Sequence, residues 1–363
     1  MKKILKIVLL PILAINLMVS LLFVCCAYSP ILPAAQTPLL SLTGLAFPFV
    51  LAANVFFLLL WLLIRPRYII VSLASCLICS PQIHTFFPIN FGRQHAPEKS
   101  LKVLSYNIFS PNINASNTNK ENAIIAYLEE ADADIVCLQE FHFSTLKKHK
   151  KLLSKYPYKS YLASNDSEAK ARYLGCLSKH PILSVEQIDI NTSTNGCCKY
   201  SILHEGDTIV VYNCHLQSNG LNGEHKNAYE QMLTNPKEQI RSKDTKELIK
   251  KLRDSAAKRA IQTDIIVANL KKETSPYIIV CGDFNDSPIS YTFQRLKGLL
   301  HDAHTTSGNG PGFSYNRNKL YYRIDHIMHS PRFKAYQCLV DQSIKKSDHY
   351  PILCFLEKKT DSR

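Results

Sequence analysis

The stretch Val280-Cys281-Gly282-Asp283-Phe284-Asn285-Asp286-Ser287-Pro288 decides the fold of this chain, because it places polar side chains directly after a buried strand. The apolar run that leads into it, Tyr277 to Cys281, predicts that strand. Residues i and i+2 of a strand point to the same face, so Asp283 and Asn285 are expected side by side where the strand meets solvent. A carboxylate beside a carboxamide suits an oxygen-ligated Mg²⁺ or Mn²⁺ and a phosphate.

The same alternation of apolar runs and polar breaks extends from residue 101 to the end of the chain. Helical periodicity predicts a helix at Asn119–Ala131, and the charge-rich region Glu224–Lys272 is also mostly helical in pattern. Apolar runs predict strands at Leu101–Ile108, Asp134–Gln139, Leu174–Leu177, Val185–Ile190, Tyr200–His204, Thr208–Cys214, Tyr277–Cys281, Ile324–His329 and Ile352–Leu356. So many strands with few helices between them predict two packed β-sheets flanked by helices, a four-layer α/β sandwich.

The first 88 residues have a different character, because they contain no Asp or Glu. Ile7–Tyr28 and Leu39–Ile64 are almost wholly apolar and exceed the roughly 20 residues needed to cross a bilayer. Tyr68–Phe87 is a third candidate span that polar residues interrupt. We therefore predict a membrane segment of two to three transmembrane helices at 1–88, a linker at 89–100 and a catalytic domain at 101–363.

Basic residues indicate how this membrane segment is oriented. Lys2, Lys3 and Lys6 predict a cytoplasmic N-terminus, and Arg65 and Arg67 place the end of the second helix on the same side. Three spans would put the rest of the chain outside, and two spans would leave it in the cytoplasm. Our prediction is three spans, which corresponds to a multi-pass protein of a bacterial-type inner (plasma) membrane with a periplasmic or extracellular catalytic domain.

Composition narrows the function only in part. The net charge of +14 is compatible with a polyanionic partner or an anionic membrane surface, although a Lys-rich solvated surface explains it equally well. Cys137, Cys214 and Cys281 fall inside apolar runs, where a thiol acts as a small hydrophobic group. The region after residue 100 contains no CxxC motif, which argues against a zinc or redox site there. The cysteine spacing assigns no disulfide.

Polar residues recur at the ends of the predicted strands. Each of them alone has a structural explanation, such as a turn former or a solvated loop residue. Their joint occurrence predicts a site assembled at one edge of the sheets. The residues concerned are Asn107, Glu140, His215, Asp283, Asn285, Asp325, Asp348 and His349.

These motifs resemble the endonuclease/exonuclease/phosphatase superfamily, which has the deoxyribonuclease I-like fold. The resemblance covers residues 101–357 and leaves out the membrane segment. The matching stretches, in the order of the family, are LSYNIF at 104–109, ADIVCLQE at 133–140, GCLSKHPI at 175–182, VYNCHLQS at 211–218, CGDFNDSP at 281–288, RIDHIM at 323–328 and SDHYPI at 347–352.

The resemblance implies a metal site and a set of catalytic residues. Glu140 would be the main carboxylate ligand of Mg²⁺, with Mn²⁺ as an alternative, Asn107 would lie beside it and Asp348 would complete the site. Ile108-Phe109 supplies no further acid, so a second metal site stays open.

The remaining residues would act on the substrate. Asp283 and Asn285 would orient the scissile phosphate and the attacking water. His349 would contact the phosphate or transfer a proton, and Asp325 would hold His349 in one tautomer. His215 would be the second histidine beside the phosphate. The sequence does not divide the roles of general base and general acid among Asp283, His215 and His349.

The chemistry of phosphodiester hydrolysis agrees with this set of residues. A metal ion can neutralise the non-bridging oxygens as a Lewis acid, and a carboxylate-paired histidine can serve in proton transfer. Arg172 and Lys179 flank one motif and could meet a phosphate, although surface charge is the simpler interpretation.

Two substrate classes and one non-catalytic alternative follow from these observations. A phosphodiester in nucleic acid would make the protein a nuclease, and a phospholipid would make it similar to the sphingomyelinases of the family. The third hypothesis is a membrane-bound binding module that keeps the fold without activity. No protein partner is indicated.

Overall fold

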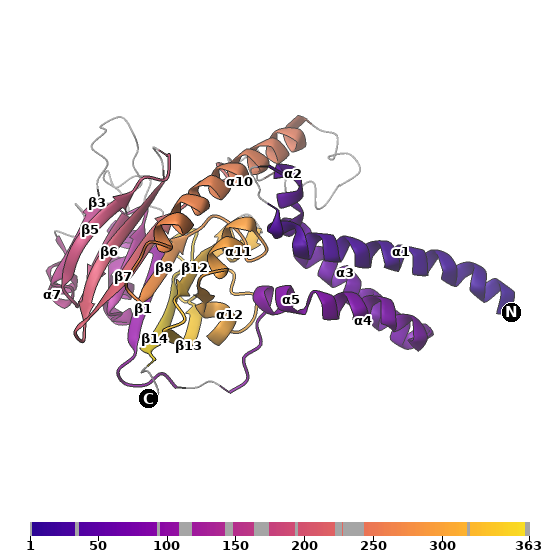
Figure 1. The fold of residues 1–363 in the computed structure, drawn as a ribbon, viewed down its shortest axis with the longest axis horizontal. Coiled ribbons are helices and arrows are strands. Elements are labelled where there is room, and N and C mark those ends of the chain that lie inside the picture. The colour runs from indigo at the N-terminus through magenta and orange to yellow at the C-terminus, as the bar shows by residue number, and fades with distance from the viewer. Residues whose placement is uncertain are drawn as a thin grey trace.

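Two β-sheets packed face to face form the body of the protein, and a bundle of helices projects from one side of it (Figure 1). The structure is a computed structural model. It describes residues 2–32, 36–92, 95–108, 118–141, 148–162, 174–192, 195–221, 227, 243–317 and 320–359. Phe109, Arg172 and the first part of the charge-rich region lie outside these residues.

Both sheets of the body are six-stranded and mixed. The first has the order β13-β14-β1-β2-β4-β3, and the second has the order β5-β6-β7-β8-β12-β9. The strands of the first sheet are β1 (Leu101–Asn107), β2 (Ile135–Gln139), β3 (Tyr158–Leu162), β4 (Leu174–Ser178), β13 (Phe333–Val340) and β14 (Ile352–Lys358). Those of the second are β5 (Ile182–Ile188), β6 (Gly196–His204), β7 (Asp207–His215), β8 (Ile278–Asp283), β9 (His301–Asp302) and β12 (Asp325–His329). A separate hairpin pairs β10 (Tyr315–Arg317) with β11 (Leu320–Tyr322).

Helices cover the outer faces of both sheets. The first sheet is covered by α6 (Thr118–Ala131) and α7 (Lys150–Lys155), and the second by α10 (Lys243–Leu270) and α11 (Tyr291–Lys297). The short helix α12 (Ala303–Ser307) packs beside β13. One hydrophobic core lies between the sheets and one lies under each helical layer. This arrangement confirms the predicted four-layer α/β sandwich.

Several elements differ from their predicted form. Every residue of β1 except Lys102 is buried, because β1 lies inside the first sheet between β14 and β2 and is covered on both faces. Its sequence predicted a strand but not this double burial. β13 was not predicted, since Lys334 and Gln337 interrupt its apolar pattern and a register shift follows Tyr336.

The N-terminal segment forms the projecting bundle. Its long helices are α1 (Lys2–Tyr28) and α3 (Thr43–Ile64), and its shorter ones are η1 (Ser29–Ile31), α2 (Pro38–Ser41), η2 (Pro66–Tyr68), α4 (Ile69–Ile78) and α5 (Ser80–Phe86). Two stretches, Leu9–Ile31 and Leu39–Ile64, are long and apolar enough to cross a membrane. Pro66–Ile78 and Ser80–Phe86 would add a third if this pair, bent by 65°, is one span.

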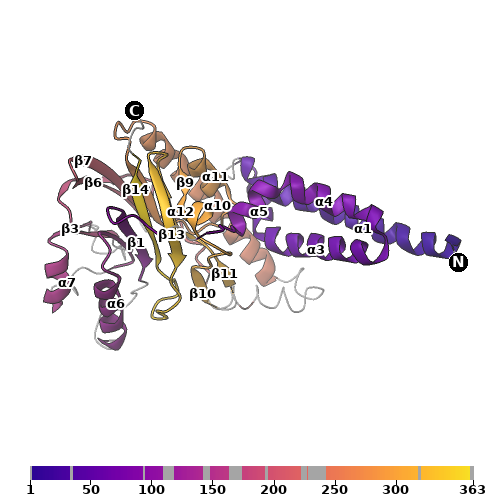
Figure 2. The ribbon, with the colours of Figure 1, turned by 90° about the horizontal axis from the view of Figure 1, so that it is seen from below.

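A buried polar network holds the bundle together. The Asn16 side chain donates to Ser72 Oγ at 2.9 Å and accepts from the indole of Trp61 at 2.9 Å. Asn54 accepts from Ser20 and donates to Ser75 Oγ at 2.8 Å. These bonds join α1, α3 and α4, so α4 packs as part of the same bundle as the two long apolar helices (Figure 2).

Gly282 is a position at which the fold permits only glycine. Its φ is +132°, and an added Cβ would lie 1.9 Å from the carbonyl oxygen of Cys214 on the adjacent strand. We expect Gly282→Ala to lower the free energy of unfolding by more than about 2 kcal/mol, because it adds a backbone collision to the conformational cost. Gly206→Ala is the matched control: its φ is +82°, but nothing lies within 4 Å of the added Cβ. Thermal unfolding of both variants checks the difference, and equal melting temperatures would contradict it.

Candidate active site

The pairing of three strands brings the predicted site residues together. β7 and β8 are parallel, and their register sets His215 opposite Asp283. β12 is antiparallel to β8, and its register sets Asp325 opposite Asp283 on the other side. The chain ends of β7 and β8 and the start of β12 therefore meet at one edge of the second sheet. In the first sheet, β1 and β2 are also parallel and end together at Asn107 and Gln139.

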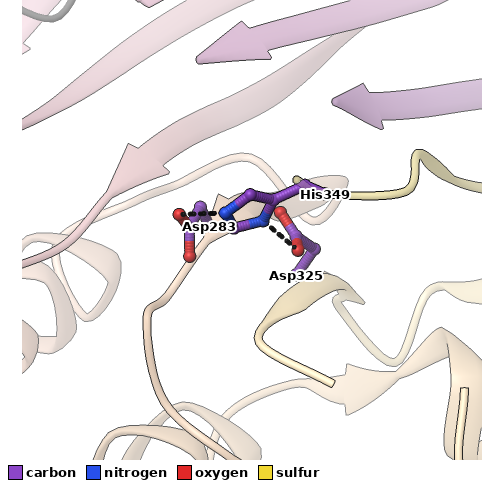
Figure 3. Close-up of side chains that lie close together, drawn as sticks. All are labelled: Asp283, Asp325 and His349. Carbon is purple, nitrogen blue, oxygen red and sulfur yellow. Dashed lines mark hydrogen bonds and ion pairs between the residues drawn. The ribbon is translucent and has the colours of Figure 1, made fainter. Parts of the chain in front are cut away.

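Asp283, Asp325 and His349 form the centre of the site (Figure 3). His349 Nδ1 lies 2.8 Å from Asp325 Oδ2, and His349 Nε2 lies 3.7 Å from Asp283 Oδ2. All three side chains are buried. The imidazole thus lies between two carboxylates, with one nitrogen directed at each, and the predicted Asp325–His349 contact is present.

Glu140, Asn107 and His215 extend the cluster around the Asp283 carboxylate. Asn107 Nδ2 donates to Asp283 Oδ2 at 2.9 Å and lies 3.4 Å from Glu140 Oε1. His215 Nε2 is 3.6 Å from Glu140 Oε1 and 3.7 Å from Asp283 Oδ2. The structure therefore joins residues from both sheets in one polar cluster.

Asp348 is brought to the cluster by the segment before β14. The Ser347 hydroxyl donates to the Asn107 carbonyl at 2.8 Å and accepts from the His349 amide at 3.2 Å. This bond fixes the Ser347-Asp348-His349 turn to the end of β1. Asp348 itself is buried, and its charge helps to raise the pKa of His349.

Asn285 does not reach the site in the way the sequence suggested. β8 ends at Asp283, so Asn285 is not its i+2 neighbour within a strand. Asn285 instead has a φ of +52°, its amide donates to Asp283 Oδ1 at 2.8 Å and its Nδ2 donates to the Leu216 carbonyl at 3.0 Å. Glu140 also has a positive φ, +53°. Two strained backbone positions thus flank the cluster, as is common where a fold supports function.

The electrostatics of the cluster follow from its burial. Burial raises the pKa of the Asp283 carboxyl to about 6, although the nearby His349 and His215 act in the opposite direction. Burial by itself would lower the pKa of His349, but the charges of Asp325 and Asp283 outweigh it and raise this pKa to about 10. At neutral pH, His349 is therefore a cation that donates from Nδ1 to Asp325 and presents an Nε2–H toward Asp283.

Ligand-type atoms of Asp283, Asp325 and His349 lie within 4.8 Å of one another, close enough to surround a metal ion. The short Asp325–His349 hydrogen bond, however, already occupies the ring nitrogen on that side. The sequence predicts an alternative set of oxygen donors, the Glu140 and Asp348 carboxylates with the Asn107 amide, and the nitrogen of that amide faces Glu140 and Asp283 in this structure. The second set consists of the oxygen donors that Mg²⁺ and Mn²⁺ prefer, whereas the first includes an imidazole nitrogen.

Three residues of the site neighbourhood were not predicted from the sequence. Tyr315 in β10 bridges to His349, and their rings meet edge to face at 5.2 Å. Behind the cluster, Gln139 Nε2 donates to Asn213 Oδ1 at 2.7 Å, and Asn213 Nδ2 donates to the carbonyls of Leu138 and Gly175. The signal that could have identified Asn213 was a polar residue inside an apolar run.

Lys179, which the sequence offered as a possible phosphate contact, pairs instead with Asp132 and Asp134.

Solved structures with this fold are similar over most of the chain. D. rerio TDP2 complexed with a single-strand DNA product is 16% identical, with a TM-score of 0.53, covering 72% of this chain and 100% of that one. An endonuclease/exonuclease/phosphatase family protein from Bacteroides thetaiotaomicron is 17% identical, with a TM-score of 0.53 and coverage of 74% and 100%. The human nocturnin catalytic domain with bound sulfate is 16% identical, with a TM-score of 0.53 and coverage of 74% and 98%. At these identities, the likeness shows the fold.

Family models match both parts of the chain. Residues 5–86 match a model described as a domain of unknown function. A search of curated proteins finds no match. Residues 104–349 match the model of the endonuclease/exonuclease/phosphatase family, and this range includes every residue of the cluster described above. The chain therefore belongs to the endonuclease/exonuclease/phosphatase family, whose enzymes are divalent-metal-dependent hydrolases of ester bonds.

Proposed function

We propose that this protein is a membrane-anchored, Mg²⁺-dependent phosphodiesterase whose site residues are those of the cluster at the sheet edges. The observation that carries the proposal is the placement of His349 between Asp325 and Asp283. A cationic imidazole held by one carboxylate and facing a second one, next to further buried carboxylates, suits hydrolysis of an anionic ester.

Glu140, Asp348 and Asn107 would hold the metal ion. The fit rests on the donors themselves: carboxylate and amide oxygens are the ligands of Mg²⁺, with Mn²⁺ as the alternative. Glu140, Asp283, Asp325 and Asp348 also bring four carboxylates into one mostly buried region, where a bound cation would offset the cost of burying their charge. When bound, the ion would supply Lewis-acid stabilisation of the phosphate oxygens.

The protein's own groups would manage the proton and the phosphate charge. Asp283, with a pKa raised toward neutrality by burial, would take a proton from the attacking water as that water forms its bond to phosphorus. His349 would stabilise the added negative charge through Nε2–H, and Asp325 would hold its orientation. His215 would bind the phosphate from the opposite side, and Asn285 would hold the loop that follows Asp283. The bond to the leaving oxygen then breaks, and that oxygen receives the proton that Asp283 took from the water, so that one water is added across the bond.

The arrangement of the bundle supports an outward-facing catalytic domain in a multi-pass inner-membrane protein. α1 runs toward the catalytic sandwich, α3 runs away from it and α4–α5 returns to it (Figures 1 and 2). The basic ends, at the N-terminus and at Arg65 and Arg67, therefore lie at the far end of the bundle. With those ends in the cytoplasm, the catalytic domain lies in the periplasm or outside the cell. We propose the same division of the chain into a membrane segment at 1–88, a linker at 89–100 and a catalytic domain at 101–363.

A phosphodiester in nucleic acid is the substrate that we propose. A single-strand DNA product is bound in the similar D. rerio structure and a sulfate anion in the human one, and this chain carries a net charge of +14. A lipid phosphodiester is the alternative that the membrane segment brings into consideration.

A substrate panel separates these classes. The full chain, purified in detergent with Mg²⁺, is assayed against single-stranded DNA, plasmid DNA, sphingomyelin and bis(p-nitrophenyl) phosphate. We expect hydrolysis of DNA and of the chromogenic diester. Turnover of sphingomyelin with no cleavage of DNA would replace the proposed substrate class, and no turnover of any of the four would refute the proposed function.

A further inference from the structure

The N-terminal bundle contacts the catalytic domain next to its active-site loop. This loop, residues 284–290, connects Asp283 at the end of β8 to α11, which Ser290 caps. Ile289 in the loop is only 1% exposed, and it is buried in the bundle's own hydrophobic core with Phe23, Phe47 and Cys79. The bundle and the loop thus share one core.

Gly44 in α3 makes a close backbone contact between the two parts. An added Cβ at Gly44 would lie 2.1 Å from the backbone carbonyl oxygen of Ile289. The α3 backbone therefore packs directly on the loop backbone, and only a glycine permits this approach. The loop cannot shift toward the bundle, and the bundle cannot shift toward the loop.

A second contact holds the segment that leads to Asp325. Arg323, which is 2% exposed, donates from its guanidinium to the carbonyls of Thr85 in α5 and of Pro311. Lys297 of α11 donates to the Thr85 hydroxyl at 2.8 Å. One residue, Ile324, separates Arg323 from Asp325, the partner of His349. The bundle therefore contacts the chain segments next to Asp283 and Asp325, the two carboxylates that face the imidazole.

The rest of the loop is rigid enough to transmit this contact. The Asp286 carboxylate pairs with Arg259 of α10 at 3.2 Å, and the Asp286 carbonyl accepts from His326 Nε2 at 3.2 Å. Asn285 is held by the Leu216 carbonyl. Since every part of the loop between Asp283 and α11 is fixed, a displacement of Ile289 has no flexible segment that could absorb it.

We propose that the N-terminal bundle is a positioning element of the active site, in which Gly44, Ile289, Thr85 and Arg323 set the place of Asp283 and Asp325. The predicted effect on turnover rests on the proposed function. The docking of the bundle on the catalytic domain does not depend on that function. A bundle that acted only as a tether would leave the catalytic domain fully active when separated from it.

Cleavage of the linker tests the docking without any activity assay. Residues 95–98 lie in the connection between α5 and β1, and a protease site can replace them. After complete cleavage in detergent, we expect the catalytic part to co-elute with the bundle and to keep the turnover rate of the uncut protein. Release of a fully active catalytic part would overturn the proposal. If the protein turns over none of the tested substrates, co-elution still shows whether the bundle is docked. Failure of the docking can therefore be told apart from failure of the proposed function.

Gly44→Ala tests the positioning. A glycine-to-alanine change inside a helix ordinarily stabilises it, so a harmful effect would come from the contact with Ile289. We expect kcat to fall about 10²-fold, as for a displacement of about 1 Å at a reacting group, with KM and the half-saturating Mg²⁺ concentration nearly unchanged. Gly298→Ala is the matched control, because Gly298 is exposed, has a φ of −64° and contacts only its own helix.

The outcomes of the two experiments are read together. A reduced kcat of Gly44→Ala supports the proposal if Gly298→Ala keeps the wild-type rate. This holds whether the bundle of the Gly44→Ala protein stays docked after linker cleavage or is released. A Gly44→Ala protein with wild-type kcat, docked or released, overturns it.

Discussion

His349→Ala is expected to lower kcat for phosphodiester hydrolysis by at least about 10³-fold, because it removes the cation that faces the phosphate and the partner that Asp325 orients. Asp325→Asn should cause a smaller loss, of about 10²-fold or more, since an amide can still contact Nδ1 but no longer favours the charged ring. Steady-state rates on bis(p-nitrophenyl) phosphate measure both effects.

The matched control for His349→Ala is His301→Ala. His301 is an exposed histidine at the outer strand β9, away from the cluster, and its replacement should leave kcat unchanged. Circular dichroism of each variant verifies that the sandwich has folded. A His349→Ala enzyme that folds and retains near-wild-type kcat would show that the imidazole has no part in the chemistry.

Glu140→Gln is expected to raise the Mg²⁺ concentration for half-maximal activity by at least about 10-fold, because it removes the charge of the main proposed ligand. Calorimetric titration of the protein with Mg²⁺ provides a readout that needs no substrate. Glu130→Gln, at an exposed position of α6, is the matched control and should bind Mg²⁺ like the wild type.

This experiment also distinguishes the two possible donor sets. If Asp283→Asn abolishes Mg²⁺ binding while Glu140→Gln leaves it intact, the metal is held by Asp283, Asp325 and His349 instead, whose ligand-type atoms lie within 4.8 Å of one another. Loss of binding in Glu140→Gln with retention in Asp283→Asn is the result that our assignment requires.

The sandwich could be predicted because its central strands are buried on both faces. Continuous apolar runs such as Ile135–Leu138 and Ile209–Tyr212 indicate this burial directly in the sequence. β3 and β13 could not be found in the same way, because they are the edge strands of the first sheet and carry exposed polar residues such as Lys159 and Lys334. The sequence of Phe333–Val340 follows that weaker pattern.

The site could be predicted as a set of residues but not as a geometry. Strand ends identify Asn107, Glu140, His215 and Asp283, since these polar side chains follow apolar runs, and His349 was identified because it stands just before the last predicted strand. Their mutual placement depends on strand register, which sequence alone does not specify across residues more than 40 apart. The expectation for Asn285 was wrong in its geometry because it assumed that the strand continued past Asp283.

The contact between the bundle and the active-site loop had no signal in the sequence. Ile289 is one of two large apolar residues in a mostly polar loop, the other being Phe284, and Gly44 is one glycine in an apolar helix. Only the three-dimensional structure shows that they touch, because 245 positions of chain separate them and Gly44 meets the Ile289 backbone rather than a matching side chain.

The central claim is that this cluster hydrolyses a phosphodiester with the help of a divalent metal. The most direct measurement is the turnover of bis(p-nitrophenyl) phosphate by the full chain in detergent, before EDTA treatment, after it, and after Mg²⁺ is restored, with His349→Ala run in parallel. Our account predicts activity that EDTA abolishes, that Mg²⁺ restores and that the variant lacks under every condition. Turnover that survives EDTA, or that is equal in the variant, would contradict it.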